Sequence, residues 1–543
     1  MNVFFKEASK FPKFSWPKSI EDTRVSIELS SHEQHEIGPQ DFESAAAMRF
    51  VLDCFSAACH ERGSVARLVS PRSPSRIENL QTFLNAFKSS AGGMLLAPVD
   101  QTGHKSVEAQ SASLDAELSQ RLSFPWLSTQ APRRQTLAIV DGGISSPEHG
   151  GTRESVYSAA AALGIDMVVL DSAKHWVNSP KYAHWRKATV PLECPLEPDS
   201  EFASRIADAV RSYEGQIDGI VTFRDHYKLP VAEAAVKLSL PTYPPSAYDI
   251  ATDKFKTSVL EGHHAVENLP QLEAGVKGIN NERHGSEFVI EKYCEGPEVD
   301  ANLVVFFEVS DDFPKSADVN GHGNVESFIE LANVPPSKLP ENELAVLQNS
   351  LHQSLLRMGF RDVFYHLEAR VENSSMEYVT KDGILDLTER SVSAKAAPTA
   401  WLIEINPRPP GIQASDAVKH TYGIDYFGVA LLFALEDKHR VKQLSHPFAQ
   451  GPQYWCEMVS IPGEKGGVYE SGDLCAELFE RRPDLAACVS GSFCFLRKGD
   501  RATDPSTSVN SWVAYFNVFS RESREHLLKV ADTIRQEVTF SII

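Results

Sequence analysis

Paired cysteines and long apolar runs are both missing from this sequence. No two of its eight cysteines form a Cys-x-x-Cys pair, which favours reduced thiols in a cytosolic protein over a disulfide framework. No apolar run reaches the roughly 18 residues of a membrane-spanning helix. The first residues contain scattered lysines and lack the apolar core of a secretory signal. We therefore expect the protein to remain in the cytoplasm. The cysteines are Cys54, Cys59, Cys194, Cys294, Cys456, Cys475, Cys488 and Cys494.

A surplus of positive charge is also lacking. The chain has 53 lysines and arginines against 73 aspartates and glutamates, which gives a formal net charge of -20. This balance argues against a nucleic-acid or anionic-membrane partner, because binding to phosphates requires cationic side chains. It leaves room for a local basic pocket that binds a nucleotide. We expect small molecules as partners.

The chain of 543 residues is too long for one hydrophobic core, and no internal repeat divides it. We predict four parts. Residues 1–130 form an N-terminal accessory domain without a chemical motif, in which 42–63 is helix-like. Residues 131–250 form a Rossmann-like domain, 251–430 form an α+β domain, and 431–543 form a C-terminal subdomain with a strand-rich segment followed by a helix.

Strand and helix patterns alternate between residues 131 and 250. Apolar runs at 135–143, 165–171 and 217–225 predict strands, and helical patterns follow them at 152–164, 200–215 and 228–240. Such alternation is typical of a parallel sheet with right-handed crossovers. Asp141, Gly142 and Gly143 follow the first strand, but the Gly-x-Gly-x-x-Gly spacing of a dinucleotide site is absent. We expect this sheet to support a substrate rather than a nicotinamide cofactor.

The next part reads as a mixed α+β unit. Residues 288–309 predict two strands joined by a turn at Glu295–Pro297, and 341–360 predict a helix with Gly359 as its C-cap. Residues 363–371 and 400–408 predict two more strands, with a long hairpin excursion at 372–399 between them.

Polar side chains follow one face of these last two strands. Because side chains alternate in a strand, Glu404 and Asn406 share one face, and Trp401, Ile403 and Ile405 are expected to pack on the other. His366 and Glu368 share a face in the preceding strand. His366 is either a structural or supporting histidine or a substrate contact.

Pairing of the two strands would bring Glu368, Glu404 and Asn406 together. Two carboxylates and an amide oxygen suit Mg²⁺, and Arg408 at the strand end could hold a phosphate or a developing oxyanion. The alternative is that the two glutamates are surface residues with ordinary ion-pair partners.

The motifs His-Leu-Glu-Ala-Arg and Trp-Leu-Ile-Glu-Ile-Asn-Pro-Arg, with the upstream segments 288–305 and 251–260, resemble the ATP-grasp superfamily. Within it, residues 135–540 are most similar to ligases that join amino acids, such as carnosine synthase and the bacterial L-amino-acid ligases. This resemblance implies a Rossmann-like pre-ATP-grasp domain followed by an ATP-grasp fold.

The resemblance also implies roles for individual residues. Glu368, Glu404 and Asn406 would bind Mg²⁺ or Mn²⁺, and Arg408 would stabilise the transferred phosphoryl group as the catalytic residue. The remaining matches would bind ATP: Lys254 as the first nucleotide-binding lysine, Glu291, Lys292 and Cys294 as the adenine hinge, and Glu298 near the ribose or the substrate amine. For Lys254, the alternative is a solvated first-turn residue behind a Thr252 or Asp253 cap.

One feature of the family is missing from the sequence. Between the first lysine and the hinge, family members carry a second phosphate-binding lysine and a glycine-rich flap, whereas residues 257–287 contain no such cluster and only Lys277 as a candidate.

The expected function is therefore an ATP-dependent carboxylate-amine ligase that works through an acyl phosphate. The alternatives are an impaired nucleotide-binding protein of the same fold, a truncated gene product, and a nicotinamide oxidoreductase that uses the first sheet. A homodimer is a family-level expectation, and the sequence does not identify the acid and amine substrates.

Overall fold

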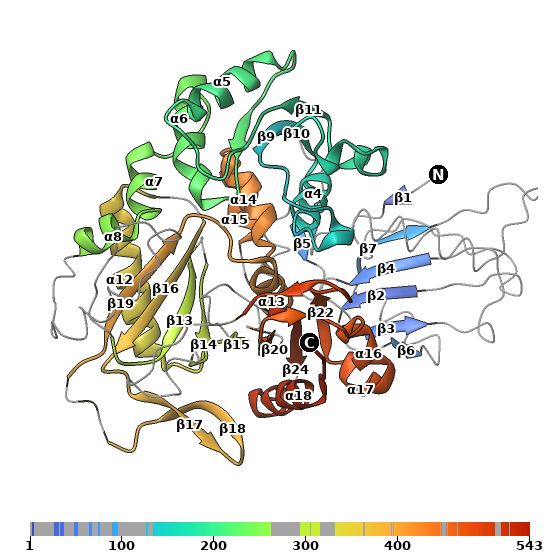
Figure 1. Cartoon of the computed structure of the whole chain (residues 1–543), viewed down its shortest axis with the longest axis vertical. Coiled ribbons are helices and arrows are strands. Elements are labelled where there is room, and N and C mark those ends of the chain that lie inside the picture. Colours follow the sequence, from blue (N-terminus) through green and yellow to red (C-terminus); the bar gives the residue numbers. More distant parts are fainter. Residues whose placement is uncertain are drawn as a thin grey trace, which may run out of the picture.

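In the computed structural model of the chain (Figure 1), eight short strands are described before residue 134. Beyond it, the described residues are 134–261, 294–303, 306–314, 332–361, 364–392, 394, 396–445, 447, 452, 454–463, 465–504, 512–520 and 522–543.

The eight early strands form two sheets. Six of them pair in the order β1-β7-β4-β2-β3-β6, and β5 pairs with β8. The prediction of a helix-like stretch at 42–63 is wrong at Met48–Leu52, because this segment is strand β4, which pairs with β2 and β7. Pairing with distant strands here overrides local helix propensity. The bounds are β1 Val3–Phe4, β2 Ile27–Ser31, β3 Glu33–Glu36, β4 Met48–Leu52, β5 Val65–Arg67, β6 Pro74–Arg76, β7 Ser90–Leu95 and β8 Trp126–Ser128.

A four-stranded parallel sheet confirms the Rossmann-like prediction. Its strand order is β11-β10-β9-β12, so the direction of winding reverses between β9 and β12. The side chains of β9 from Thr136 onward are buried, as the apolar run requires, and Gly164 ends α4 in the left-handed conformation with φ 69°. The strands are β9 Gln135–Val140, β10 Ile165–Asp171, β11 Ala188–Pro191 and β12 Gly219–Val221. The helices are α4 Glu154–Leu163, α5 Phe202–Ser212, α6 Lys228–Leu238, α7 Pro245–Ala251 and α8 Lys254–Glu261, with 3₁₀ turns η3 Pro147–His149, η4 Trp176–Asn178, η5 Pro180–Trp185 and η6 Asp225–Tyr227.

An eight-stranded sheet forms the second large element, in the order β19-β16-β13-β14-β15-β20-β24-β22. It continues across the predicted boundary between 251–430 and 431–543, and the division into domains stays a prediction. Its strands are β13 Glu298–Leu303, β14 Phe307–Asp312, β15 Ala332–Val334, β16 Tyr365–Glu372, β19 Thr399–Asn406, β20 Trp455–Pro462, β22 Val489–Cys494 and β24 Trp512–Ser520. The predicted hairpin excursion is present as β17 Met376–Lys381 and β18 Ile384–Glu389, and β21 Gly467–Val468 pairs with β23 Arg501–Ala502.

Helices cover this sheet and join it to the parallel one. The predicted helix is α12 Glu341–Met358, which packs its leucines against the apolar side of β13, β16 and β19. Helix α14 Tyr426–Ala434 is buried together with α4 and the parallel strands, and lies between the two sheets in Figure 1. The remaining helices are α13 Ile412–Tyr422, α15 Lys438–Leu444, α16 Leu474–Arg481, α17 Pro483–Ala486 and α18 Arg524–Glu537.

Two local predictions are wrong. Residues 298–309 do not form one strand, because β13 ends at Leu303 and β14 returns antiparallel beside it, with Leu303 opposite Phe307. The turn lacks the glycine or proline that would mark it in the sequence. In β19, a register shift opposite Glu368 and Ala369 leaves Ile403 without a partner, so Leu402 and Ile405 enter the core while Trp401 and Ile403 are half-buried.

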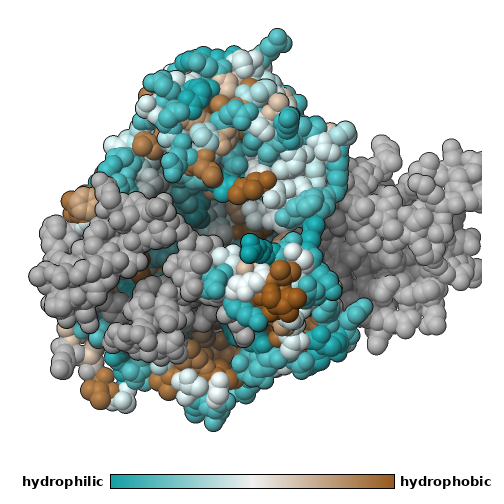
Figure 2. Space-filling view, in the orientation of Figure 1, coloured by the Kyte–Doolittle hydropathy of each residue, from teal (hydrophilic) through white to brown (hydrophobic). Residues whose placement is uncertain are grey.

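Hydrophilic residues cover most of the coloured surface in Figure 2, as a net charge of -20 leads one to expect. Within the described ranges, no helix is long and apolar enough to cross a lipid bilayer. The six cysteines of those ranges carry free thiols, in agreement with the expected reduced state, and Cys54 and Cys59 lie outside them.

Candidate active site

Two rows of polar side chains cross three neighbouring strands on the side of the sheet opposite α12. Asp300 of β13 is in register with Glu368 of β16, which is in register with Glu404 of β19. Side chains that are directly opposite in neighbouring strands have Cβ atoms about 4.5–5.5 Å apart. The predicted pairing of Glu368 with Glu404 is therefore confirmed.

The second row lies one pleat further along the same strands. In it, Asn302, His366 and Asn406 are in register. Since each row places one polar residue on each strand, six polar side chains share a single patch of the sheet.

The second row is fixed by a chain of hydrogen bonds. Nδ1 of His366 lies 3.1 Å from Oδ1 of Asn302, and Nδ2 of Asn302 donates to Oε1 of Glu308 at 2.5 Å. The hydroxyl of Tyr426 donates to the same Glu308 oxygen at 3.0 Å. Because Oδ1 of Asn302 can only accept, Nδ1 of His366 carries the proton and Nε2 keeps its lone pair.

Burial shifts the pKa values of two residues in this series of hydrogen bonds, His366 and Glu308. The pKa of His366 is lowered to about 3 by burial and, to a lesser extent, by Arg408, so its ring is neutral at physiological pH. Burial raises the pKa of Glu308 to about 7, although hydrogen bonds from Asn302, Tyr426 and Ser310 oppose the shift. A neutral imidazole is the form of histidine that binds metal ions.

The geometry of Asp300, His366 and Glu368 fits a metal ion. One potential ligand atom from each lies within 4.8 Å of the others, and atoms bound to one ion at about 2.1–2.4 Å cannot be further apart than this. The two carboxylates suit Mg²⁺ or Mn²⁺, and the imidazole is better suited to Mn²⁺ than to Mg²⁺. The residues therefore fit the expected metal, with Asp300 and His366 beside Glu368.

Arg408 connects this patch to the Rossmann-like part of the chain. Its Nε lies 2.8 Å from each carboxylate oxygen of Asp225 in η6, and its Nη2 donates to Oδ1 of Asn406 at 3.2 Å. Its Nη1 donates to the carbonyl oxygen of Pro409. The guanidinium is thus held beside the second polar row by contacts from both halves of the molecule.

Three cavities surround this arginine and the polar rows. A cavity of about 170 Å³ contains Asp300 and His366 and is walled by Met458, Phe495, Trp512 and Tyr515. A second, of about 490 Å³, is lined by Arg153, Arg224 and Arg408.

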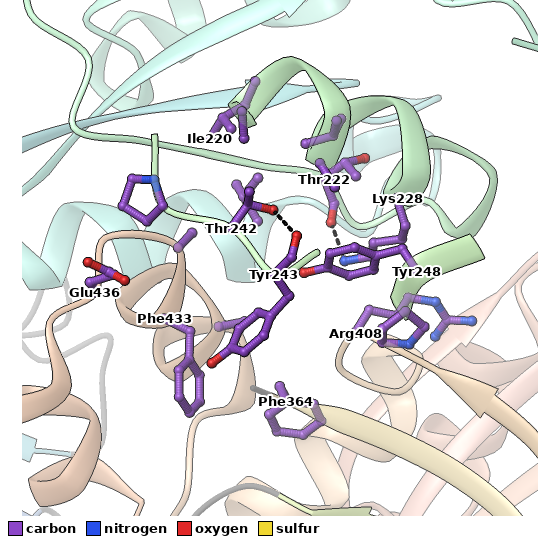
Figure 3. A pocket seen from close by; sticks show the side chains of 18 of the residues that line it. Ile220, Thr222, Lys228, Thr242, Tyr243, Tyr248, Phe364, Arg408, Phe433 and Glu436 are labelled. Carbon is purple, nitrogen blue, oxygen red and sulfur yellow. Dashed lines mark hydrogen bonds between the residues drawn. The ribbon is translucent and has the colours of Figure 1, made fainter. Parts of the chain in front are cut away.

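A third cavity, of about 360 Å³, is drawn in Figure 3 and also includes Arg408. There Lys228 lies near Tyr248 and Arg408, and its Nζ donates to the carbonyl oxygen of Thr222 at 2.7 Å. Burial lowers the pKa of Lys228 to about 7, although Asp225 opposes the shift.

The predicted nucleotide-binding residues lie in different settings. Lys254 is exposed as the first residue of α8, and Asp253 accepts a hydrogen bond from the backbone N–H of Lys256, as a cap would. Cys294 is buried, and its carbonyl oxygen accepts from Arg370 at 3.3 Å. Glu298 is buried in an ion pair with Arg370, in which the Nη2 and Oε2 atoms lie 2.7 Å apart.

Glu291, Lys292, Lys277 and the stretch predicted to lack the flap lie outside the described residues. The nucleotide-binding roles of all these residues stay predictions.

Sequence reasoning missed Asp300 and Asp225. Asp300 could have been found, because Glu298, Asp300 and Asn302 alternate with apolar residues as the other polar strands do. Asp225 is the last residue of the third predicted strand and follows the observed strand β12 at the carboxyl edge of the parallel sheet, where ligands bind in such folds, but nothing local links it to Arg408.

Comparison with known proteins gives consistent results. Residues 157–242 match the family described as the ATP-grasp N-terminal domain. Over 511 residues the chain is 40% identical to the ATP-grasp enzyme fsqD of Aspergillus fumigatus. The matched region covers 84% of this chain and 88% of that protein.

Among solved structures, an L-amino acid ligase from Bacillus licheniformis is similar over 76% of this chain and 99% of its own, with a TM-score of 0.56 and 19% identity. A phosphoribosylglycinamide synthetase from Anaerococcus prevotii covers 76% of this chain and 100% of its own, with a TM-score of 0.49 and 13% identity. The likeness to the first of these confirms the predicted fold.

Proposed function

This chain belongs to the ATP-grasp family, and from that membership we propose that it is an ATP-dependent ligase that joins a carboxylate to an amine, with amino acids as substrates. The observation that carries the proposal is the row Asp300, Glu368 and Glu404, beside the second row in which Asn406 accepts a hydrogen bond from Arg408. Carboxylates that can hold a divalent metal, beside a fixed guanidinium, are the groups that phosphoryl transfer requires.

Each residue of the patch has a role in this proposal. Asp300, Glu368 and Glu404, with Nε2 of His366 and Oδ1 of Asn406, would hold the divalent metal. When bound, Mg²⁺ or Mn²⁺ supplies Lewis acidity and offsets phosphate charge. Lys254 contacts the nucleotide, and the hinge around Cys294 receives the adenine.

The reaction proceeds in two steps. The substrate carboxylate attacks the γ-phosphorus of ATP, the bond to the β-phosphate oxygen breaks, and ADP leaves as the acyl phosphate forms. Arg408 stabilises the charge on the transferred phosphoryl group, and Asp225 keeps the guanidinium in place. An amine then attacks the acyl carbon, phosphate leaves with the electron pair of the broken C–O bond, and the amine proton passes to solvent.

The test is ADP release by the purified full-length chain with ATP, a divalent metal and pooled amino acids, followed by mass spectrometry of the products. We expect ADP release that requires both the metal and an amino acid, and a product whose mass equals two substrates minus one water. ADP release without an amino acid would indicate an ATPase. No ADP release from the folded protein would favour a nucleotide-binding protein without ligase activity.

A further inference from the structure

The cavity of about 490 Å³ lies at the carboxyl edge of the parallel sheet. Its walls are the segments 143–145 and 150–153, residues 223–226 and the turn 408–412. Because the winding of the sheet reverses between β9 and β12, this edge is where open α/β sheets bind their ligands. Arg408 lines this cavity and also the cavity drawn in Figure 3.

Two arginines of this cavity share one buried carboxylate. Oδ2 of Asp141 accepts from Nη2 of Arg153 at 3.0 Å and from Nε of Arg224 at 2.7 Å. Burial opposes ionisation of Asp141, but Arg153 and Arg224 lower its pKa, so the carboxylate stays charged. A single aspartate thus offsets only one of two neighbouring positive charges.

Both arginines have nitrogen atoms that form no hydrogen bond with the described residues. Only 8% of Arg153 is exposed, and its Nε has no hydrogen-bond partner within the described part of the chain. A buried donor without a partner is costly. Arg224 uses its Nε on Asp141, and among described residues no hydrogen bond is made by its two terminal nitrogens.

The loop in front of these arginines is shaped to admit Arg153. Gly143 has φ 109°, and a Cβ there would lie 2.3 Å from Cγ of Arg153. A side chain at this position would displace the arginine from the cavity wall. Gly143 thus makes room for a cation, rather than belonging to a dinucleotide fingerprint.

The charge of the cavity selects the ligand class. Its charged lining consists of Arg153, Arg224 and Arg408 against Asp225 alone, with Asp141 directly behind it. Two aspartates against three arginines leave about one positive charge, in a chain whose net charge is -20. This charge balance matches a singly charged carboxylate better than a doubly charged phosphate. A guanidinium can bind a carboxylate or a phosphate through paired N–H groups.

The cavity adjoins the proposed reaction centre. Pro410 and Gly411 line both this cavity and the one that contains Asp300 and His366. A ligand held by Arg224 is therefore separated from the polar rows by a single turn of chain. The two cavities therefore adjoin at this turn.

We propose that the cavity between Arg153, Arg224 and Arg408 binds the free carboxylate of an amino acid whose amine attacks the acyl phosphate. The inference rests on the proposed function, since it assigns one substrate of that ligase. It adds that the amine substrate is an amino acid with an unmodified carboxylate, and that the Rossmann-like part selects it. An amine without that carboxylate is a poor substrate.

The test is a binding experiment that needs no turnover. The thermal stability of the full-length chain is titrated with individual amino acids, with the matching carboxamides and with inorganic phosphate. We expect at least one amino acid to raise the midpoint of unfolding, and its carboxamide to bind at least tenfold more weakly. In Arg224→Gln the apparent affinity for that amino acid falls at least tenfold. Arg205→Gln, which removes an exposed arginine paired with Asp199, leaves it unchanged.

Several outcomes would overturn this assignment. Equal affinity for an amino acid and its carboxamide would mean that the carboxylate is not recognised. An unchanged affinity of Arg224→Gln for the amino acid, or no binding of any amino acid, would also overturn the assignment. If phosphate raised the midpoint of unfolding while amino acids did not, and Arg224→Gln abolished this rise, the cavity would be assigned to a phosphate group instead. ADP release tests the ligase proposal separately, so failure of one does not imply failure of the other.

Discussion

Arg408 and Asp225 are 183 positions apart in the sequence, yet Nε of Arg408 lies 2.8 Å from both carboxylate oxygens of Asp225. One residue follows the last strand of the polar patch, and the other follows the last strand of the parallel sheet. The pair therefore couples the position of Arg408, for which we propose a role in stabilising the transferred phosphoryl group, to the part of the chain that we propose selects the amine substrate.

Loss of this pair should affect turnover more than nucleotide binding. In Asp225→Asn the guanidinium keeps its charge but loses an ionic partner that fixes its orientation. We expect kcat for ADP release to fall roughly 10- to 100-fold, because small misplacement of a catalytic group is costly. The KM for ATP should stay within about twofold, since no nucleotide contact is assigned to Asp225. Steady-state ADP release at varied ATP measures both.

Asp199→Asn is the matched control, because Asp199 also pairs with an arginine, but at the exposed start of α5. It should retain the activity of the unmodified protein. If Asp225→Asn were equally active, Arg408 would not depend on Asp225 for its position.

Glu404 tests the row of carboxylates. Glu404→Gln keeps the size of the side chain and removes its charge, so the site loses a proposed metal ligand without a change in volume. We expect ADP release to fall by at least about two orders of magnitude. Glu372→Gln, at the other end of the same strand pair, is the control and should leave activity intact. Near-normal ADP release from Glu404→Gln would remove Glu404 from the metal site.

How far the sequence predicts this site depends on how local each contact is. The alternation of Glu404 and Asn406, and of His366 and Glu368, sets the polar face within each strand, so the pairing of β16 with β19 could be predicted. The bulge at Ile403 could not, because the run from Thr399 to Asn406 contains no glycine that would mark it.

Contacts between distant segments are the least predictable. Arg224 and its partner Asp141 follow neighbouring parallel strands, β12 and β9, whereas the pairing of Asp225 with Arg408 is set by how the two sheets pack through α14. Such packing depends on many apolar contacts at once, and no single motif encodes it.

Asp300 should determine metal affinity in the absence of nucleotide. Asp300→Asn removes one of three clustered groups that can act as metal ligands, and we expect the affinity for Mn²⁺ to fall at least about tenfold. Mn²⁺ titration followed by electron paramagnetic resonance measures free ion directly and requires no activity. Asp382→Asn is a suitable control, because Asp382 lies in the exposed β17–β18 turn at φ 53°, which asparagine tolerates. Unchanged Mn²⁺ affinity in Asp300→Asn would exclude Asp300 as a ligand.

Glu308 should make the stability of the protein depend on pH. Burial raises its folded pKa to about 7 from an ordinary value of 4.5, so its contribution to stability is full below pH 4.5 and is lost as the pH rises through 7. From about pH 5 to about pH 8 the free energy of unfolding should therefore decline by roughly 2 kcal/mol through this group. In Glu308→Gln that decline should disappear, because the amide oxygen still accepts from Asn302 and Tyr426 and nothing ionises. Urea unfolding at the two pH values measures the difference, with Glu377→Gln on the β17–β18 hairpin as the control. A decline of equal size in Glu308→Gln would show that Glu308 does not titrate in this range.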